Sequence, residues 1–150
     1  MSAPLWPAAC AELVRAGWIN AEGEALSRAA WRDEAHWRVA DLGADWFLRL
    51  AATCWAWRRD ARGPMALRFD AWPGCEAFAF PEVDARLWPT ELGQWLETMQ
   101  RLWPRVQQGE CLPLQGGAVR LQVHWGDGPA ITAAQARGVQ AANTVWPTRD

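Results

Sequence analysis

Seven apolar side chains between residues 92 and 106 recur at the spacing of one helix face, and this stripe constrains the fold more than any other feature. They are Leu92, Trp95, Leu96, Met99, Leu102, Trp103 and Val106. Residues three and four apart share a face, so the stripe predicts an amphipathic helix of about four turns. Pro104 removes a backbone donor near its end, and Gly109 is placed to terminate it.

Alternating apolar and polar residues predict strands on both sides of this helix. Residues 65–71 and 119–125 alternate strictly, and shorter runs at 75–80 and 112–114 fit the same period. The glycines of residues 115–117 supply a hairpin turn before the last strand. These segments predict a sheet that the helix covers.

Three further segments complete the predicted order. Apolar spacing after Pro7 predicts a short helix to about Trp18, and Asn20 is placed to cap a second helix over residues 21–37. Residues 46–57 fit a strand by alternation and a helix by three-four spacing. We favour the strand, because residues 58–64 are typical of a hairpin connection.

The sequence therefore predicts an α+β fold in which one long helix covers an antiparallel sheet of about four to six strands, with one or two N-terminal helices. All 150 residues are expected to form a single domain. Residues 1–40 are its helical N-terminal part, residues 41–130 hold the sheet and the long helix, and residues 131–150 form a weakly defined tail.

The composition favours recognition over chemistry. The chain has 13 Trp, no Tyr and no Lys, so Arg carries every basic side-chain charge, and the net charge is only −2. Arginine stacks on indoles and pairs with carboxylates, whereas the small net charge predicts no basic face for nucleic acid. No targeting signal or membrane-length apolar run is present, which predicts a cytoplasmic protein that does not bind membranes.

Signatures of catalysis and cofactor binding are absent from the sequence. A phosphate-binding loop would need a Gly-rich turn before a helix and usually a Lys, and neither Ser2 nor Ser27 lies in a nucleophile motif. The four Cys and two His show no zinc-site spacing. We therefore expect no cofactor, no metal and no enzymatic activity, with a Cys111–His124 dyad on adjacent strands as the enzymatic alternative.

Carboxylates interleaved with aromatic residues indicate a surface for a protein partner. Such a mixture is typical of protein interfaces, in which charge steers association and indoles anchor it. The predicted partner-binding residues are Asp41, Asp45, Trp46, Glu82, Asp84, Trp88 and Glu91.

The order of motifs in residues 41–125 resembles that of WapI-type immunity proteins from bacterial polymorphic-toxin systems. The signs are Asp45 and Trp46 opening a strand, then Trp88 to Leu92 leading into Trp95 on a helix that ends at Gly109, before two further strands. The resemblance implies a non-enzymatic protein that neutralises a cognate toxin by direct contact. The element order is also similar to class I type III secretion chaperones, an alternative that implies an effector partner and a homodimer.

Overall fold

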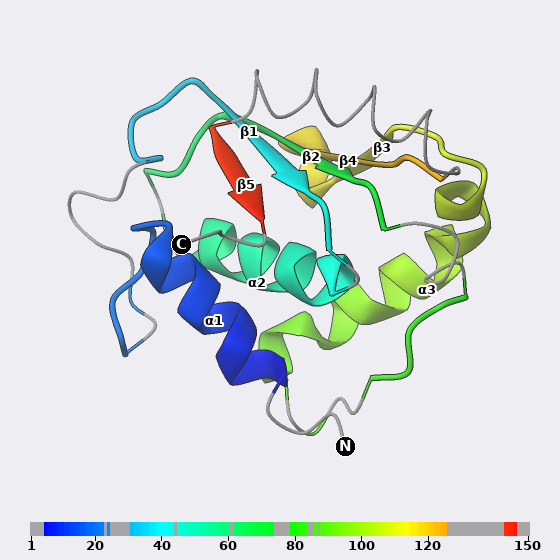
Figure 1. Cartoon of the computed structure of the whole chain (residues 1–150), viewed down its shortest axis with the longest axis horizontal. Helices are drawn as coiled ribbons and strands as arrows, with labels where there is room; N and C mark the ends of the chain where they lie inside the picture. Colours follow the sequence, from blue (N-terminus) through cyan, green and yellow to red (C-terminus); the bar gives the residue numbers. More distant parts are fainter. Residues whose placement is uncertain are drawn as a thin grey trace.

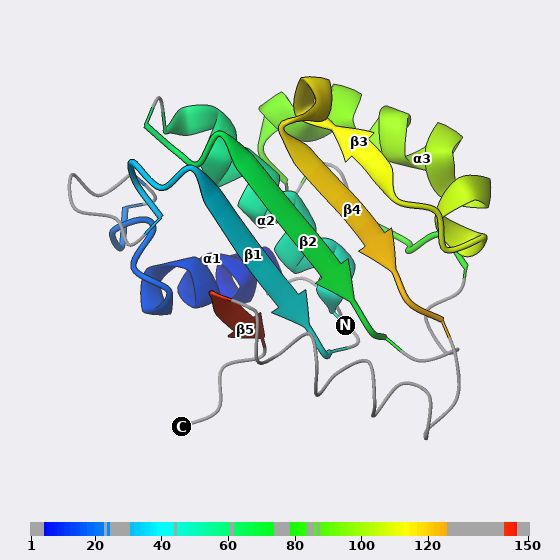
Figure 2. The same ribbon diagram turned by 90° about the horizontal axis from the view of Figure 1, so that it is seen from above.

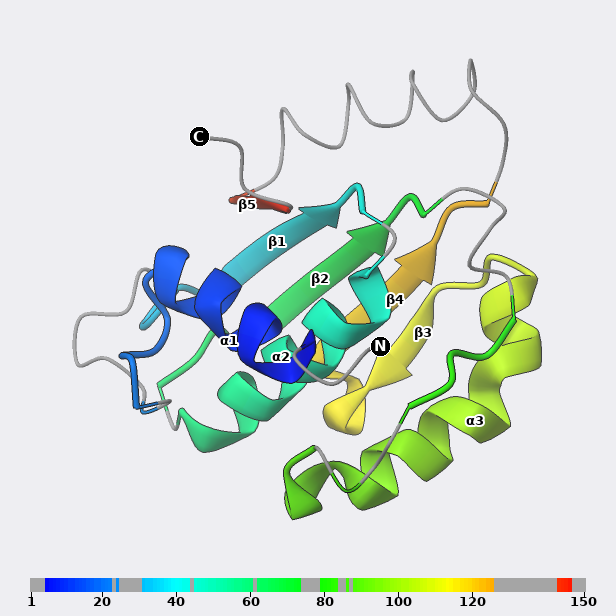
Figure 3. The same ribbon diagram turned by 60° about the horizontal axis from the view of Figure 1, so that its bottom comes forward.

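The computed structural model describes residues 5–22, 24, 31–43, 45–60, 62–73, 79–83, 86, 88–125 and 143–146. Within these residues a five-stranded sheet in the order β3-β4-β2-β1-β5 lies against helices α1, α2 and α3, which share one side of it (Figures 1 and 3). In chain order the elements are α1 (Leu5–Arg15), β1 (His36–Asp41), α2 (Trp46–Arg59), β2 (Ala66–Ala71), η3 (Thr90–Leu92), α3 (Gly93–Gln107), β3 (Leu112–Leu114), η4 (Gln115–Gly117), β4 (Val119–Val123) and β5 (Thr144–Trp146).

The sheet is mostly parallel, so the prediction of an antiparallel sheet under one long helix is wrong. β1 pairs in parallel with both β2 and β5, and β2 pairs in parallel with β4, while β3 is an antiparallel strand at the edge. Figure 2 shows β1, β2 and β4 running in the same direction. Parallel neighbours need a long crossover, and α2 supplies it between β1 and β2.

The largest local error concerns α2, because residues 46–59 form a helix and not the favoured strand. Eleven of its residues are buried, including Arg49 and Thr53. A helix buried on nearly all sides has no broad polar face to reveal its period, so alternation described these residues equally well. The helical alternative was correct, and the connection after Arg59 joins α2 to β2 instead of joining two strands of a hairpin.

The predicted helix over residues 21–37 is also wrong where the structure describes it, since β1 begins at His36 and residues 31–33 form a turn. The other main elements are confirmed: α1, α3, β2, β3 and β4 lie where the patterns place them. Gly109 ends α3 with a φ of 75°, a conformation in which glycine is favoured. The predicted strand over 75–80 lies mostly outside the described residues, and Ala79 and Phe80 are not in a strand.

Among the side chains that the structure describes, seven Trp are buried, so much of the Trp content serves to fill the hydrophobic core. Trp18 stacks on Trp31 with centroids 4.3 Å apart, and Trp46 stacks on Trp103 at 5.9 Å. Phe47 of α2 contacts Trp95 and Trp103 of α3. These rings join the helices into one hydrophobic layer beneath the sheet. None of the helices in the described residues is long and apolar enough to cross a bilayer.

A buried carboxylate ties the segment before β1 to the end of α2. Asp60 accepts hydrogen bonds from the Trp31 indole at 2.9 Å and from two nitrogens of Arg32 at 2.8 and 3.2 Å. Burial opposes ionisation of Asp60, but these bonds and one from the Arg62 backbone outweigh it and hold the pKa of Asp60 below its ordinary value.

Stability is therefore expected to fall in acid partly through Asp60. A carboxyl whose pKa is lowered by folding stabilises the protein fully above its unfolded pKa of about 4, and this stabilisation is lost as the pH falls through the folded pKa. Denaturation between pH 7 and pH 2 should show a shallower acid decline for Asp60→Asn than for the wild type. Asp33→Asn, which changes an exposed carboxylate paired with Arg62, is the control expected to keep the wild-type slope.

Candidate functional site

The sheet carries a row of arginines on the face opposite the helices. Side chains alternate across a strand, so the apolar residues of β2 and β4 pack on the helices and the polar residues between them point the other way. The strand register aligns Arg38 of β1 with Arg68 of β2, and Arg68 with Arg120 of β4. At the spacing of neighbouring strands, the backbone positions of this arginine row span about 10 Å.

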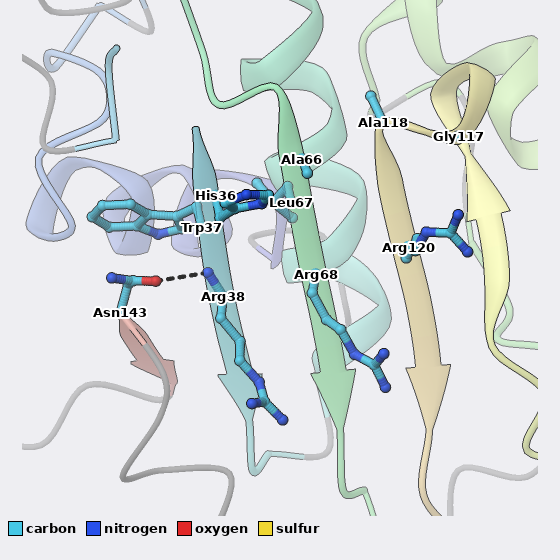
Figure 4. Close-up of a pocket in the computed structure, with 10 residues that line it drawn as sticks. All are labelled: His36, Trp37, Arg38, Ala66, Leu67, Arg68, Gly117, Ala118, Arg120 and Asn143. Atoms are coloured by element: carbon cyan, nitrogen blue, oxygen red, sulfur yellow. Dashed lines mark hydrogen bonds between the residues drawn. The ribbon is translucent and has the colours of Figure 1, made fainter. Parts of the chain in front are cut away.

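A pocket lies over the amino-terminal halves of these strands. Its lining includes all three arginines of the row, together with His36, Gly117 and Asn143. Figure 4 shows the Arg38 and Arg68 side chains extending along their strands toward the carboxyl ends. The Asn143 side chain accepts a hydrogen bond from the Arg38 backbone at 2.9 Å, which joins the residue before β5 to this face.

Asp70, two residues after Arg68 on the same face of β2, interacts with the guanidinium groups of Arg68 and Arg38. Its carboxylate accepts two hydrogen bonds from Arg68, at 3.0 and 3.1 Å, and lies 3.6 Å from the Arg38 guanidinium. Arg68 also donates to Gln122 at 2.7 Å, so its planar group is fixed on two sides. Burial disfavours the charged carboxylate, but hydrogen bonds from His124 and Arg68 prevail and lower the pKa of Asp70.

The arginine row keeps a positive charge despite Asp70. Asp70 pairs with Arg38 and Arg68, two positive groups for one carboxylate, and Arg120 has no ion pair within the described part of the chain. The Arg38 and Arg68 side chains are 41% and 40% exposed, and Arg120 is exposed as well. Exposed guanidinium groups on neighbouring strands are suited to anions with several oxygens, such as phosphates.

His124 belongs to this polar face and not to a cysteine dyad. Its Nε2 lies 2.8 Å from Asp70, and its ring stacks on Trp72 with centroids 4.6 Å apart. Cys111 is exposed, and no bond joins it to His124 among the residues that the structure describes. The Cys111–His124 alternative is therefore not supported by the geometry. In the same residues, no group of His, Cys, Asp and Glu side chains could hold a metal ion.

The predicted partner-binding residues do not form one surface. Asp41 and Trp46 are 0% and 1% exposed, so neither can contact a partner directly. Trp88 is partly buried against Phe47, with ring centroids 6.2 Å apart. Asp45, Glu82 and Glu91 are exposed, and the last lies 3.6 Å from Arg59. Asp84 lies outside the described residues.

Sequence reasoning missed the arginine row because it judged charge over the whole chain. Arg68 and Arg120 occupy the polar positions of two correctly predicted strands, a local signal that the net charge of −2 conceals. Arg38 directly follows the predicted helix over residues 21–37 and was not assigned to a strand, so its place beside them could not be foreseen. Parallel pairing of β1, β2 and β4 is what brings the three together.

Two comparisons with known proteins agree in pointing to MnmC. No family model matches the chain. The chain is 30% identical over 111 residues to the tRNA 5-methylaminomethyl-2-thiouridine biosynthesis bifunctional protein MnmC of Acidovorax sp. (strain JS42), covering 71% of this chain and 17% of that protein. The crystal structure of MNMC2 from Aquifex aeolicus matches with a TM-score of 0.50 and 16% identity over 89% of this chain and 36% of the other.

These findings correct the functional prediction. The fold is similar to that of about a third of the MNMC2 chain, and this chain spans about a sixth of the MnmC protein it matches. The MnmC relative is named for tRNA 5-methylaminomethyl-2-thiouridine biosynthesis, so the prediction of an immunity protein with a toxin or effector partner and no nucleic acid is wrong. The resemblance to WapI-type proteins is not tested by either comparison, but the function inferred from it does not stand.

Proposed function

We propose that this chain is an RNA-binding module that acts in tRNA modification and holds RNA phosphates on the arginine row. The observation that carries the proposal is the in-register alignment of Arg38, Arg68 and Arg120 on an accessible sheet face. The similarity to MnmC supplies the RNA context.

Phosphate contacts explain how an acidic chain could bind an acidic polymer. Guanidinium groups pair with phosphate oxygens through charge-assisted hydrogen bonds, and each phosphate contact releases counterions from the RNA. The remainder of the chain carries the excess of carboxylates and repels RNA. We therefore expect RNA to bind at the sheet face, in one orientation relative to the protein, and not nonspecifically over the whole surface.

The proposed role is binding without catalysis, in the cytoplasm. Asp70, which could otherwise activate a substrate group, is held by Arg68 and His124 and is only 1% exposed. The activity of the full-length MnmC protein is not part of the proposal, because most of that protein lies outside the match.

Replacing Arg120 with alanine is the most direct test. Arg120 is the member of the row without a described ion pair, so its loss leaves no buried carboxylate unpaired. We expect Arg120→Ala to bind unmodified tRNA about tenfold more weakly at 0.1 M salt, which is about 1.4 kcal/mol. The slope of log affinity against log salt should become shallower by about one. Fluorescence anisotropy with end-labelled tRNA over a salt series measures both.

Arg101→Ala is the matched control, since Arg101 is an exposed arginine of α3 on the helix-covered side of the sheet. It changes the net charge identically and should leave the salt slope unchanged. Equal weakening by both variants would mean that only overall charge matters. If a folded Arg120→Ala protein binds tRNA as tightly as the wild type, the arginine row is not the RNA site.

A further inference from the structure

The turn between β1 and α2 lies where folds of this type commonly bind nucleotides. In open parallel sheets, ligands bind outside the carboxyl ends of the strands, where successive connections leave one strand in opposite directions. The strand order reverses beside β1, because β2 and β4 follow on one side of it and β5 is added on the other. A nucleotide site there needs a glycine-rich turn and a helix N-terminus that is open to phosphate.

In this protein an internal ion pair fills the end of β1. The Asp41 carboxylate accepts hydrogen bonds from Nε and Nη2 of Arg49, at 2.7 and 2.9 Å, and from the Gly43 backbone at 3.0 Å. Asp41 is fully buried and Arg49 is 7% exposed. The Gly43 N–H and the Arg49 guanidinium, which could otherwise bind an incoming anion, are thus already bonded to the Asp41 carboxylate.

The start of α2 is equally unsuited to a phosphate. Asp45, at the N-cap, is exposed and makes no side-chain capping bond, so its carboxylate stands at the helix N-terminus and repels another anion. Trp46 follows with an indole that is buried and stacks on Trp103. Between Asp41 and Asp45 the sequence contains Gly43 as its one glycine, where a dinucleotide turn uses three.

We infer that the Asp41–Arg49 pair has closed the nucleotide position of this fold and now anchors α2 to β1. The protein would then bind its partner without a nucleotide cofactor at this turn. This inference does not depend on the RNA-binding proposal, because it concerns the opposite end of β1 from the pocket and different residues.

Equilibrium dialysis of the full chain with NAD, FAD, ATP and S-adenosylmethionine tests the inference. These probes cover nucleosides with and without phosphate groups. We expect no saturable binding of any of them up to 1 mM, roughly the weak limit of specific affinity. Should a probe bind, Gly43→Val decides where, since a side chain at Gly43 would obstruct a ligand at the turn.

Binding that Gly43→Val abolishes, in a variant shown by circular dichroism to be folded, would overturn the inference. Binding that Gly43→Val leaves intact would place the probe elsewhere and support it. Asp45→Asn provides a second arm: because Asp41 and Arg49 occupy the turn, removal of the Asp45 carboxylate is expected to create no binding of ATP or of uncharged adenosine. A gain of more than tenfold for ATP would show that the turn still accepts nucleotides and would also overturn the inference.

Discussion

Arg49→Ala is expected to lower the free energy of unfolding by about 3–5 kcal/mol, because it would leave the Asp41 carboxylate buried without its cation. Burial raises the pKa of Asp41, and the two bonds from Arg49 oppose that shift. Conversely, burial disfavours the charged guanidinium, but the bond to Asp41 and the negative charges of Asp41 and nearby carboxylates together outweigh it and raise the pKa of Arg49. Urea denaturation at pH 7 measures the loss.

A double replacement distinguishes the loss of the Asp41–Arg49 ion pair from the cost of leaving one buried charge without its partner. In Asp41→Leu/Arg49→Met both charges are exchanged for apolar side chains, so no unpaired charge remains and only the Gly43 backbone N–H loses its acceptor. Replacing a buried ion pair in this way is often close to neutral. We expect the double variant to be at least about 2 kcal/mol more stable than Arg49→Ala. If Arg49→Ala loses less than about 1 kcal/mol, water reaches Asp41 and the turn is not closed.

Trp95→Ala is expected to cost about 3–5 kcal/mol through the cavity that it leaves. Trp95 is 5% exposed and lies 5.4 Å from Phe47 of α2, centroid to centroid, so the cavity would open between two helices. Gln94→Ala, one position earlier on the exposed side of α3, should be nearly neutral. Comparable denaturation midpoints for the two variants would contradict the packing of α3.

Elements with two chemically distinct faces could be predicted from the sequence, and elements without them could not. α3 and β4 each present one apolar and one polar side, so their periods were visible. α2 is buried nearly all round, and even its charged Arg49 lies inside, so its sequence had no such contrast. The error at α2 then determined the error in the sheet, because without a crossover helix a parallel arrangement is not available.

The polar face could be predicted only in part, for a different reason. Arg68, Arg120 and His124 were assigned to solvent-facing positions of their strands, which the structure confirms for Arg120 and in part for the others. Their association with Arg38 depends on strand order, which brings residues far apart in the sequence into one register row. Conversely, Asp41 and Trp46 were assigned to a surface because they are polar and aromatic, although the Arg49 bond allows Asp41 to be buried.

The arginine row has a consequence for the energetics of the sheet itself. Like charges on directly neighbouring strands destabilise the pairing between them, and Asp70 neutralises only part of the charge on β1 and β2. Without a bound anion, the guanidinium groups of Arg38, Arg68 and Arg120 therefore repel one another and destabilise the sheet. A bound polyanion would relieve this repulsion, so part of the binding free energy would appear as added stability of the strands, and occupancy and folding would be thermodynamically linked.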